Sequence, residues 1–137
     1  MKAYFDNKQA EIINTMVYPA PCNFSVELDS DCNNGLMVFA PKLRKIEKGA
    51  YDNIITVERG RHFAGEIEVT GDNTLIYFED GAYADGKITA KNCDKLTIAG
   101  NGIISMENYC RNGGSYGAVR IDGCTNVQIK DITVLDN

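Results

Sequence analysis

Apolar and polar residues alternate along residues 66–137 in three copies of one pattern. The copies begin at Glu66, Lys87 and Ala118, so the second interval is longer than the first. Each copy has an alternating strand, a polar corner rich in Gly, Asn and Asp, and a second alternating strand. The surplus of the longer interval falls in one insertion, residues 106–117. A period in the low twenties, built from short strands and corners, is typical of a solenoid whose repeats stack on a shared core.

The alternation also predicts which side chains face that core. Stacking similar repeats in register requires ladders of similar residues, and a β-sandwich, the rival fold, gives no reason for its strands to repeat one another. We therefore predict an all-β fold, a right-handed single-stranded parallel β-helix over residues 46–137. The predicted core columns are Ile67/Ile88/Val119 and Val69/Ala90/Ile121 in the first strand, Leu75/Leu96/Val127 and Tyr77/Ile98/Ile129 in the second, and Ala82/Ile103/Ile132 with Ser105/Val134 in a third.

Residues 1–45 lack the repeat and predict a separate N-terminal cap or partial β segment. Residues 1–20 carry apolar residues at helical spacing after Asp6, a candidate N-cap, which favours a short amphipathic helix. Residues 24–28 and 36–40 alternate or run apolar on either side of a polar turn, which predicts two strands.

Charge and composition narrow the classes of partner. The net charge of −5 and the pI near 4.8 argue against a nucleic-acid partner, because no basic stripe is present to neutralise phosphates. No apolar run has the length of a membrane span, so we expect no membrane partner. The N-terminus has no apolar stretch of signal-peptide type, which favours a cytoplasmic protein, or a secreted one if a leader has been removed.

The five cysteines predict packing in preference to metal binding. With no C-x-x-C spacing and a single His, a zinc site is not expected, and no motif indicates a cofactor. Cys93 and Cys124 occupy the same corner of successive repeats, where strands lie about 4.8 Å apart. Parallel Cβ vectors suit a disulfide poorly, so we expect a reduced, packed pair. Cys22 and Cys32 flank the predicted strand pair and could bridge in an oxidising compartment; the sequence leaves this open.

The insertion holds the best candidates for contact with a ligand. Loops that project from a rigid scaffold form binding walls, and Tyr and Arg can stack on a sugar and hydrogen-bond to it. We predict that Tyr109, Arg111 and Tyr116 bind substrate, together with Arg120 on the outward side of the following strand.

Carboxylates are the groups that a hydrolytic site would need. Inverting cleavage of a glycosidic bond requires two carboxyl groups roughly 6.5–9.5 Å apart. No two acids clearly share an outward strand face at adjacent repeats, and Asp at a corner is ordinary turn chemistry, so no catalytic residue is predicted. The candidate acids are Asp80, Asp85, Asp122, Asp131 and Asp136.

Two further polar groupings are interpreted as surface features. Glu66 beside Lys87 predicts an exposed cross-strand ion pair. His62, with Arg59 and Arg61, forms a small basic cluster that we expect to be a solvated turn.

Several segments resemble the polygalacturonase-type pectin hydrolases, glycoside hydrolase family 28. Residues 113–137 contain CTNVQIKDIT, similar to the family's C-x-N-V-x-I-x-x-I-T, and residues 75–82 and 96–104 are similar to its strand and Gly-rich corner motifs. Residues 55–65 resemble its first strand. The resemblance covers about residues 50–137 and implies a pectin lyase-like β-helix acting on a pectin-like polysaccharide.

The same resemblance implies that the catalytic machinery is missing. The family's catalytic residues lie in motifs of the type N-T-D-G, D-D, G-H-G and R-x-K, and none occurs in this sequence. His62 is not in a G-H-G setting. We therefore expect the N-terminal portion of a glycoside hydrolase, without activity of its own. The alternative is a standalone short β-helix that binds carbohydrate or assembles with itself through its open C-terminal repeat.

Overall fold

The computed structural model describes residues 22–26, 35–40, 46–109 and 117–135, and the chain divides into two compact units, Met1–Ala40 and Pro41–Asn137. In the first unit, β1 (Cys22–Val26) pairs antiparallel with β2 (Leu36–Ala40). The two predicted strands are therefore present, although the first begins earlier than expected, at Cys22. The helix predicted within residues 1–20 lies outside the described residues.

The second unit is all-β, and its described strands pair in parallel in two sheets. One sheet has the order β10-β7-β5-β3, and the other has the order β11-β8-β6-β4 with β9 also paired to β6. The strands are β3 (Asn53–Val57), β4 (Gly60–Val69), β5 (Thr74–Phe78), β6 (Ala82–Lys91), β7 (Leu96–Gly100), β8 (Ile103–Ser105), β9 (Val119–Asp122), β10 (Gln128–Lys130) and β11 (Thr133–Leu135).

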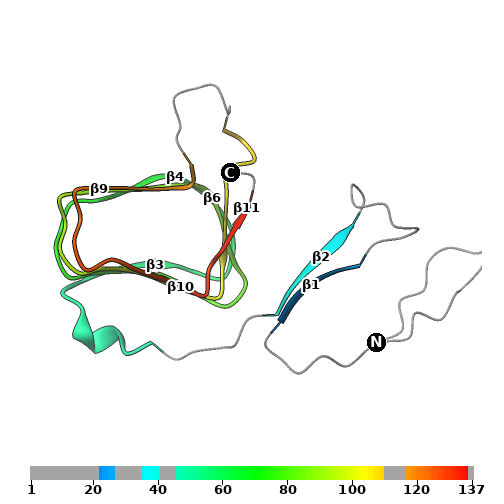
Figure 1. Ribbon diagram of the computed structural model, residues 1–137, viewed down its shortest axis with the longest axis horizontal. Coiled ribbons are helices and arrows are strands. Elements are labelled where there is room, and N and C mark those ends of the chain that lie inside the picture. The colour runs from blue at the N-terminus through cyan, green and yellow to red at the C-terminus, as the bar shows by residue number, and fades with distance from the viewer. Residues whose placement is uncertain (1–21, 27–34, 41–45, 110–116, 136–137) are drawn as a thin grey trace, which may run out of the picture. The chain divides into compact units, whose positions relative to one another are not determined.

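The chain passes through these sheets repeatedly in the same order, and one passage is here named a rung. Figure 1 shows successive rungs nearly superposed. β3 and β4 form the first rung, β5 and β6 the second, β7 to β9 the third, and β10 and β11 the fourth. The ladder between the long strands β4 and β6 shifts register between Phe63 and Gly65. Their first halves continue the ladder into β8 and β11, whereas the second half of β6 pairs with β9.

The core lies between the sheets and follows the predicted first-strand columns. Ile67, Ile88 and Val119 are in register and pack together, and so are Val69, Ala90 and Ile121. The largest fully buried core side chains are Ile76, Phe78, Ile88, Leu96, Ile98 and Ile104. Matched rungs therefore bury one continuous apolar interior.

The predicted register of the second strand is wrong by one position in the first copy. Ile76 is opposite Ile98, which is opposite Ile129, so Ile76 holds the core position predicted for Tyr77. Leu96 is likewise opposite Thr74 and not Leu75.

Corner geometry explains the shift. Counted from the in-register residues Val69, Ala90 and Ile121, the paths to β7 and β10 are one position longer than the path to β5. The additional residues are Asn92 (φ 53°) and Gly123 (φ 63°), which are left-handed. Such conformations suit Asn and Gly and allow a compact corner. The alternation of apolar residues alone does not predict this extra residue.

The outward face of β5 is covered by the segment that precedes β3. Lys48, in the 3-10 helix η2 (Lys48–Ala50), lies over the Tyr77 ring at 4.2 Å from its centroid. Tyr51 Oη donates to Thr97 Oγ1 at 3.2 Å, beside the fully buried Leu75. Leu75 and Tyr77 thus belong to an outer, covered face.

The third-strand columns also need correction, because Ile104 and not Ile103 faces the core. Ile104 is opposite Ala84 and fully buried, whereas Ile103 is opposite the outward Tyr83. Val134 is accordingly opposite Ile104 and not Ser105. The preceding corner is very tight. Gly100 has φ +133°, and a Cβ there would overlap the Phe78 carbonyl oxygen, so only glycine fits.

Candidate functional site

The first halves of β4 and β6 present a polar and aromatic outer face. Arg61 is opposite Tyr83, and Phe63 is opposite Asp85, so these four side chains alternate outward from the sheet. Asp85 is in turn opposite Ser105, the last residue of β8. Three successive rungs therefore contribute to one face.

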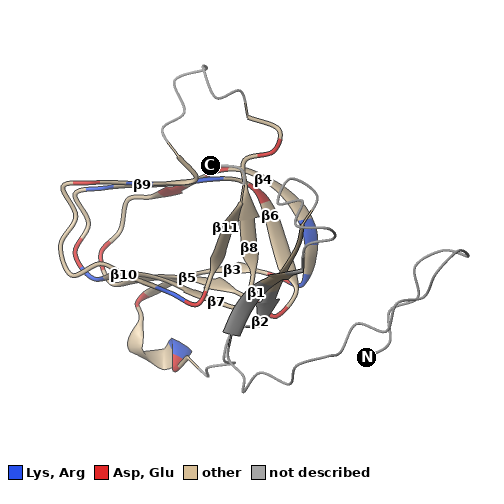
Figure 2. Cartoon of the chain, turned by 45° about the vertical axis from the view of Figure 1, so that its right-hand side comes forward, with Lys and Arg blue, Asp and Glu red and all other residues tan. Residues whose placement is uncertain are grey.

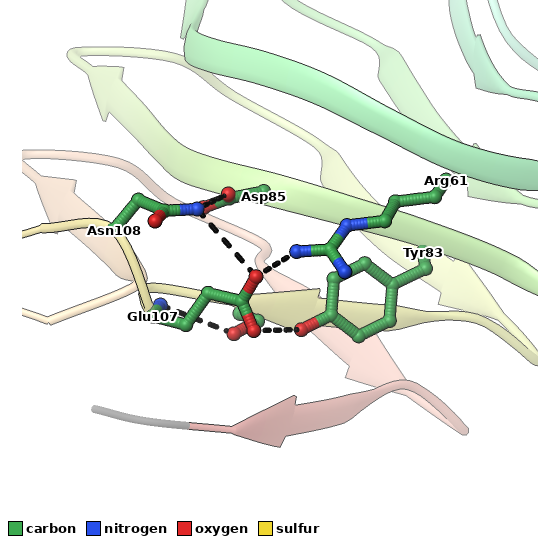
Figure 3. Close-up of polar contacts among 6 residues, drawn as sticks. Arg61, Tyr83, Asp85, Glu107 and Asn108 are labelled. Carbon is green, nitrogen blue, oxygen red and sulfur yellow. Dashed lines mark hydrogen bonds and ion pairs between the residues drawn. The ribbon is translucent and has the colours of Figure 1, made fainter.

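The chain leaving β8 turns back over this face. Glu107 N–H donates to Ser105 Oγ at 3.2 Å, and Tyr109 N–H donates to the Met106 carbonyl at 2.8 Å, which closes a tight turn. This turn places Glu107 and Asn108 against side chains of the two preceding rungs (Figure 3). We name the set Arg61, Tyr83, Asp85, Glu107 and Asn108 the Glu107 cluster.

Three donors converge on the Glu107 carboxylate. Arg61 Nη2 makes an ion pair with Oε1, and Asn108 Nδ2 lies 3.5 Å from the same oxygen. Tyr83 Oη donates to the other oxygen, Oε2, at 3.1 Å. The Arg61 guanidinium also lies 5.1 Å from the centroid of the Tyr83 ring, a cation–π distance that orients it. The Arg61 and Glu107 side chains remain 64% and 35% exposed, so solutes can reach the pair.

Asp85 is the buried member of the cluster. It is 2% exposed, and its Oδ2 accepts a hydrogen bond from Asn108 Nδ2. Its Oδ1 is buried and has no hydrogen-bond partner among the described residues. A buried polar atom in this state is costly and uncommon in folded proteins.

The other candidate acids from the sequence have structural roles where they are described. Asp122 pairs with Arg120, and Asp80 accepts from Asn101 Nδ2 at 2.8 Å. Asp131 has a left-handed backbone, φ 58°, at a corner. Asp136 lies outside the described residues.

The predicted substrate-binding residues fall at separate places. Tyr109 is half-buried and packs against the core. Arg120 is exposed on β9, opposite Thr89 and further along β6 than the Glu107 cluster, with its Nε 2.8 Å from Asp122 Oδ2. Arg111 and Tyr116 lie outside the described residues. The substrate-binding role of all four stays a prediction.

The second halves of β4 and β6 contain both acidic and basic residues (Figure 2). The predicted pair is present: Lys87 Nζ lies 3.1 Å from Glu66 Oε2, and Thr89 Oγ1 donates to Glu66 Oε1 at 2.9 Å. The Lys87 contact and then the Thr89 hydrogen bond lower the pKa of Glu66. The basic cluster predicted as a solvated turn is not one, because Arg61 and His62 lie within strand β4, where His62 Nε2 is 2.9 Å from the Glu58 carbonyl oxygen.

The corners form a polar ladder of their own. Asp72 Oδ1 accepts from Asp94 N–H at 2.7 Å, and Asp94 Oδ1 accepts from Thr125 Oγ1 at 2.5 Å and Asn126 Nδ2 at 2.7 Å. Hydrogen bonds from Thr125 and then Asn126 lower the pKa of Asp94. These acids satisfy corner amides and hydroxyls, as expected for turn residues.

The cysteine pair occupies the same corner and is reduced, as predicted. Cys93 and Cys124 are both free thiols, and the Cys93 N–H donates to Cys124 Sγ at 3.4 Å. Burial, and then the neighbouring Cys124, raise the pKa of the Cys93 thiol. The bridge between Cys22 and Cys32 that the sequence leaves open involves side chains outside the described residues.

Within the described ranges, no group of three or more His, Cys, Asp or Glu side chains is placed to hold a metal ion. Nor does any helix there have the length and apolar character to cross a membrane.

The sequence singles out several residues of the Glu107 cluster but does not predict that they lie together. From the sequence, Arg61 is expected in a solvated turn and Asp85 as an isolated acid, and nothing singles out Tyr83. The register between β4 and β6 brings them together, because it places Arg61 opposite Tyr83 and Phe63 opposite Asp85.

Comparison with protein-family models, with curated proteins and with solved structures gives no match for this chain.

Proposed function

We propose that this chain is a section of a right-handed single-stranded parallel β-helix from a polysaccharide-degrading hydrolase of the polygalacturonase type, and that it binds glycan. The parallel stacking of rungs on one core supports the β-helix, and the motif resemblance over residues 50–137 supports the enzyme class. The observation that carries glycan binding is the Glu107 cluster, which gathers three rungs at the base of the insertion, residues 106–117.

The outer face around the cluster suits a sugar chemically. Sugars need hydrogen-bond donors and acceptors around their hydroxyls and an apolar surface under the ring. Arg61, Tyr83 and Asn108 supply the polar groups. Phe63, the next outward side chain along β4 from Arg61, is 78% exposed and supplies an aromatic surface. Phe63 is opposite Asp85 in register, so this aromatic surface lies directly beside the polar cluster.

Binding can be tested by sedimentation of the chain with insoluble polygalacturonate. We expect Arg61→Gln and Phe63→Ala each to weaken binding several-fold. Lys91→Gln is the matched control, because it removes the same charge from an exposed position at the far end of β6. If Arg61→Gln and Lys91→Gln weakened binding equally, the interaction would depend only on net charge and not on this site. Failure of the wild-type chain to bind any pectic polymer would overturn the proposal.

Hydrolysis is a separate question. Because the family's catalytic motifs have no counterpart in the sequence, we expect the pure chain to release no reducing ends from polygalacturonate above the blank. Release of reducing ends would show that the chain carries its own acid pair.

A second candidate function is a self-assembling module. Ile129 on β10 and Val134 on β11 are 49% and 42% exposed, so the last described rung presents apolar side chains at its edge. Strand edges with apolar residues favour pairing with another copy. Sedimentation equilibrium should then give a dimer or larger species that Ile129→Glu dissociates, and a strictly monomeric wild-type mass at high concentration would contradict this function.

A further inference from the structure

We infer that the Glu107 cluster is a carboxylate-binding site occupied by the protein's own Glu107 side chain, which an external carboxylate of a uronic-acid unit replaces. The uronic-acid source of that carboxylate rests on the proposed glycan function. The anion site itself rests only on the contacts described below.

Two of the three donors lie in a different kind of segment from the Glu107 carboxylate. Arg61 and Tyr83 lie on β4 and β6, which are paired strands of one sheet and opposite each other in register. Glu107 lies beyond the end of β8, in the first part of the insertion. Arg61 and Tyr83 are therefore fixed by the ladder, whereas Glu107 and the third donor, Asn108, belong to a segment outside it.

The donors match a planar carboxylate. The Arg61 guanidinium contacts Oε1 and the Tyr83 hydroxyl donates to Oε2 at 3.1 Å, so each carboxylate oxygen has a donor of its own. Asn108 Nδ2 adds a further donor at 3.5 Å from Oε1. Charge-assisted contacts of this kind recognise carboxylates by geometry as well as by charge.

Exchange of one carboxylate for another is energetically accessible. The Arg61 and Glu107 side chains are 64% and 35% exposed, and exposed ion pairs contribute little net stability. Glu107 thus acts as a weak internal competitor. A ligand that must displace it loses apparent affinity in proportion to the fraction of molecules in which the site is occupied.

The neighbouring Asp85 selects the charge of the ligand. Its buried carboxylate shares the Asn108 amide with Glu107, so an incoming anion meets a negative group at close range. A uronate carboxylate brings the same single charge as Glu107 and adds no repulsion. A phosphate dianion would add a further negative charge beside Asp85, which disfavours it.

The test compares Glu107→Ala with the wild-type chain for binding of D-galacturonate by calorimetry or NMR titration. Removing a competitor of this strength should tighten galacturonate binding about fivefold, equivalent to ~1 kcal/mol. Galactose, which lacks the carboxylate, should show no gain, and the double variant Arg61→Gln/Glu107→Ala should lose it. Glu107→Gln keeps the side-chain shape and should gain affinity by a smaller factor.

The outcomes separate this inference from the proposed function. Acetate binding to Glu107→Ala without glycan binding by the wild-type chain would support the anion site and reject the glycan role. Polymer binding by the wild type, with no gain in either Glu107 variant, would overturn the anion site alone. An equal gain for galactose and galacturonate would also overturn it, because the carboxylate would then be irrelevant.

Discussion

The column formed by Ile76, Ile98 and Ile129 gives an internally controlled prediction of core energetics. Ile98 is fully buried between its two neighbours, whereas Ile129 has the same chemistry in the same column and is 49% exposed. Truncating each to alanine therefore removes identical atoms from two different environments.

The magnitudes follow from that difference. Ile→Ala removes three carbons, or roughly 2.4 kcal/mol of transfer free energy at about 0.8 kcal/mol each when fully buried. At Ile98 the truncation leaves a cavity, because buried residues surround the side chain on all sides, and this raises the expected loss of unfolding free energy to roughly 3–4 kcal/mol. At Ile129 about half the transfer term applies and no closed cavity forms, so the expected loss is about 1 kcal/mol.

Urea unfolding followed by far-UV circular dichroism and tyrosine fluorescence measures both losses, since the chain has seven Tyr and no Trp. The free energies are to be compared at a common m-value, because a changed slope would indicate a changed unfolded or native state. Losses of equal size at Ile98 and Ile129 would refute the reasoning. They would mean that Ile129 is covered in solution, as the self-assembling module requires.

Three other perturbations test the corners. Gly100→Ala should destabilise by roughly 3 kcal/mol or more, because its Cβ would overlap backbone, whereas Gly49→Ala, with open space around it, should stay within about 0.5 kcal/mol in the same unfolding assay. The pKa of Asp94 is lowered in the folded state, so its carboxylate adds stability above about pH 4 that is lost as pH falls through the folded value. Asp94→Asn should therefore flatten the dependence of the unfolding free energy on pH in that range. An unchanged dependence would contradict the polar ladder of the corners. Iodoacetamide followed by peptide mass spectrometry should modify the half-exposed Cys124 before Cys93, whose buried thiol has a raised pKa, and equal rates would contradict the packing.

Periodicity predicts the columns wherever the path between rungs is of constant length. Ile67, Ile88 and Val119 hold equivalent places in the three sequence copies, and the structure places them in register. The predicted places of Leu75 and Tyr77 are wrong because left-handed residues lengthen the later corners. Apolar alternation predicts the strands but not the length of a corner, because the identity of corner residues depends on backbone conformation and hydrogen bonding.

The candidate site is harder to predict for the same reason. The register between β4 and β6 shifts after Phe63, so the spacing that pairs Glu66 with Lys87 does not pair Arg61 with Tyr83. Glu107 belongs to the insertion, and its approach to Arg61 depends on a tight turn after β8 that no local motif marks. Sequence patterns thus predict the scaffold, and backbone irregularities build the site.

The contact between Arg61 and Glu107 also bears on cooperativity. In a stack whose strands bond only to the next rung, unfolding can proceed stepwise from one end, with each rung opening at its own free energy. Arg61 belongs to the first rung and Glu107 follows β8 of the third, so their ion pair reaches past the second rung altogether. With Tyr83 as the intermediate contact, it links three rungs and favours their opening as one unit. A ligand that takes the place of Glu107 would occupy the same donors and break this link. Ligand binding would therefore lower the cooperativity with which the three rungs unfold.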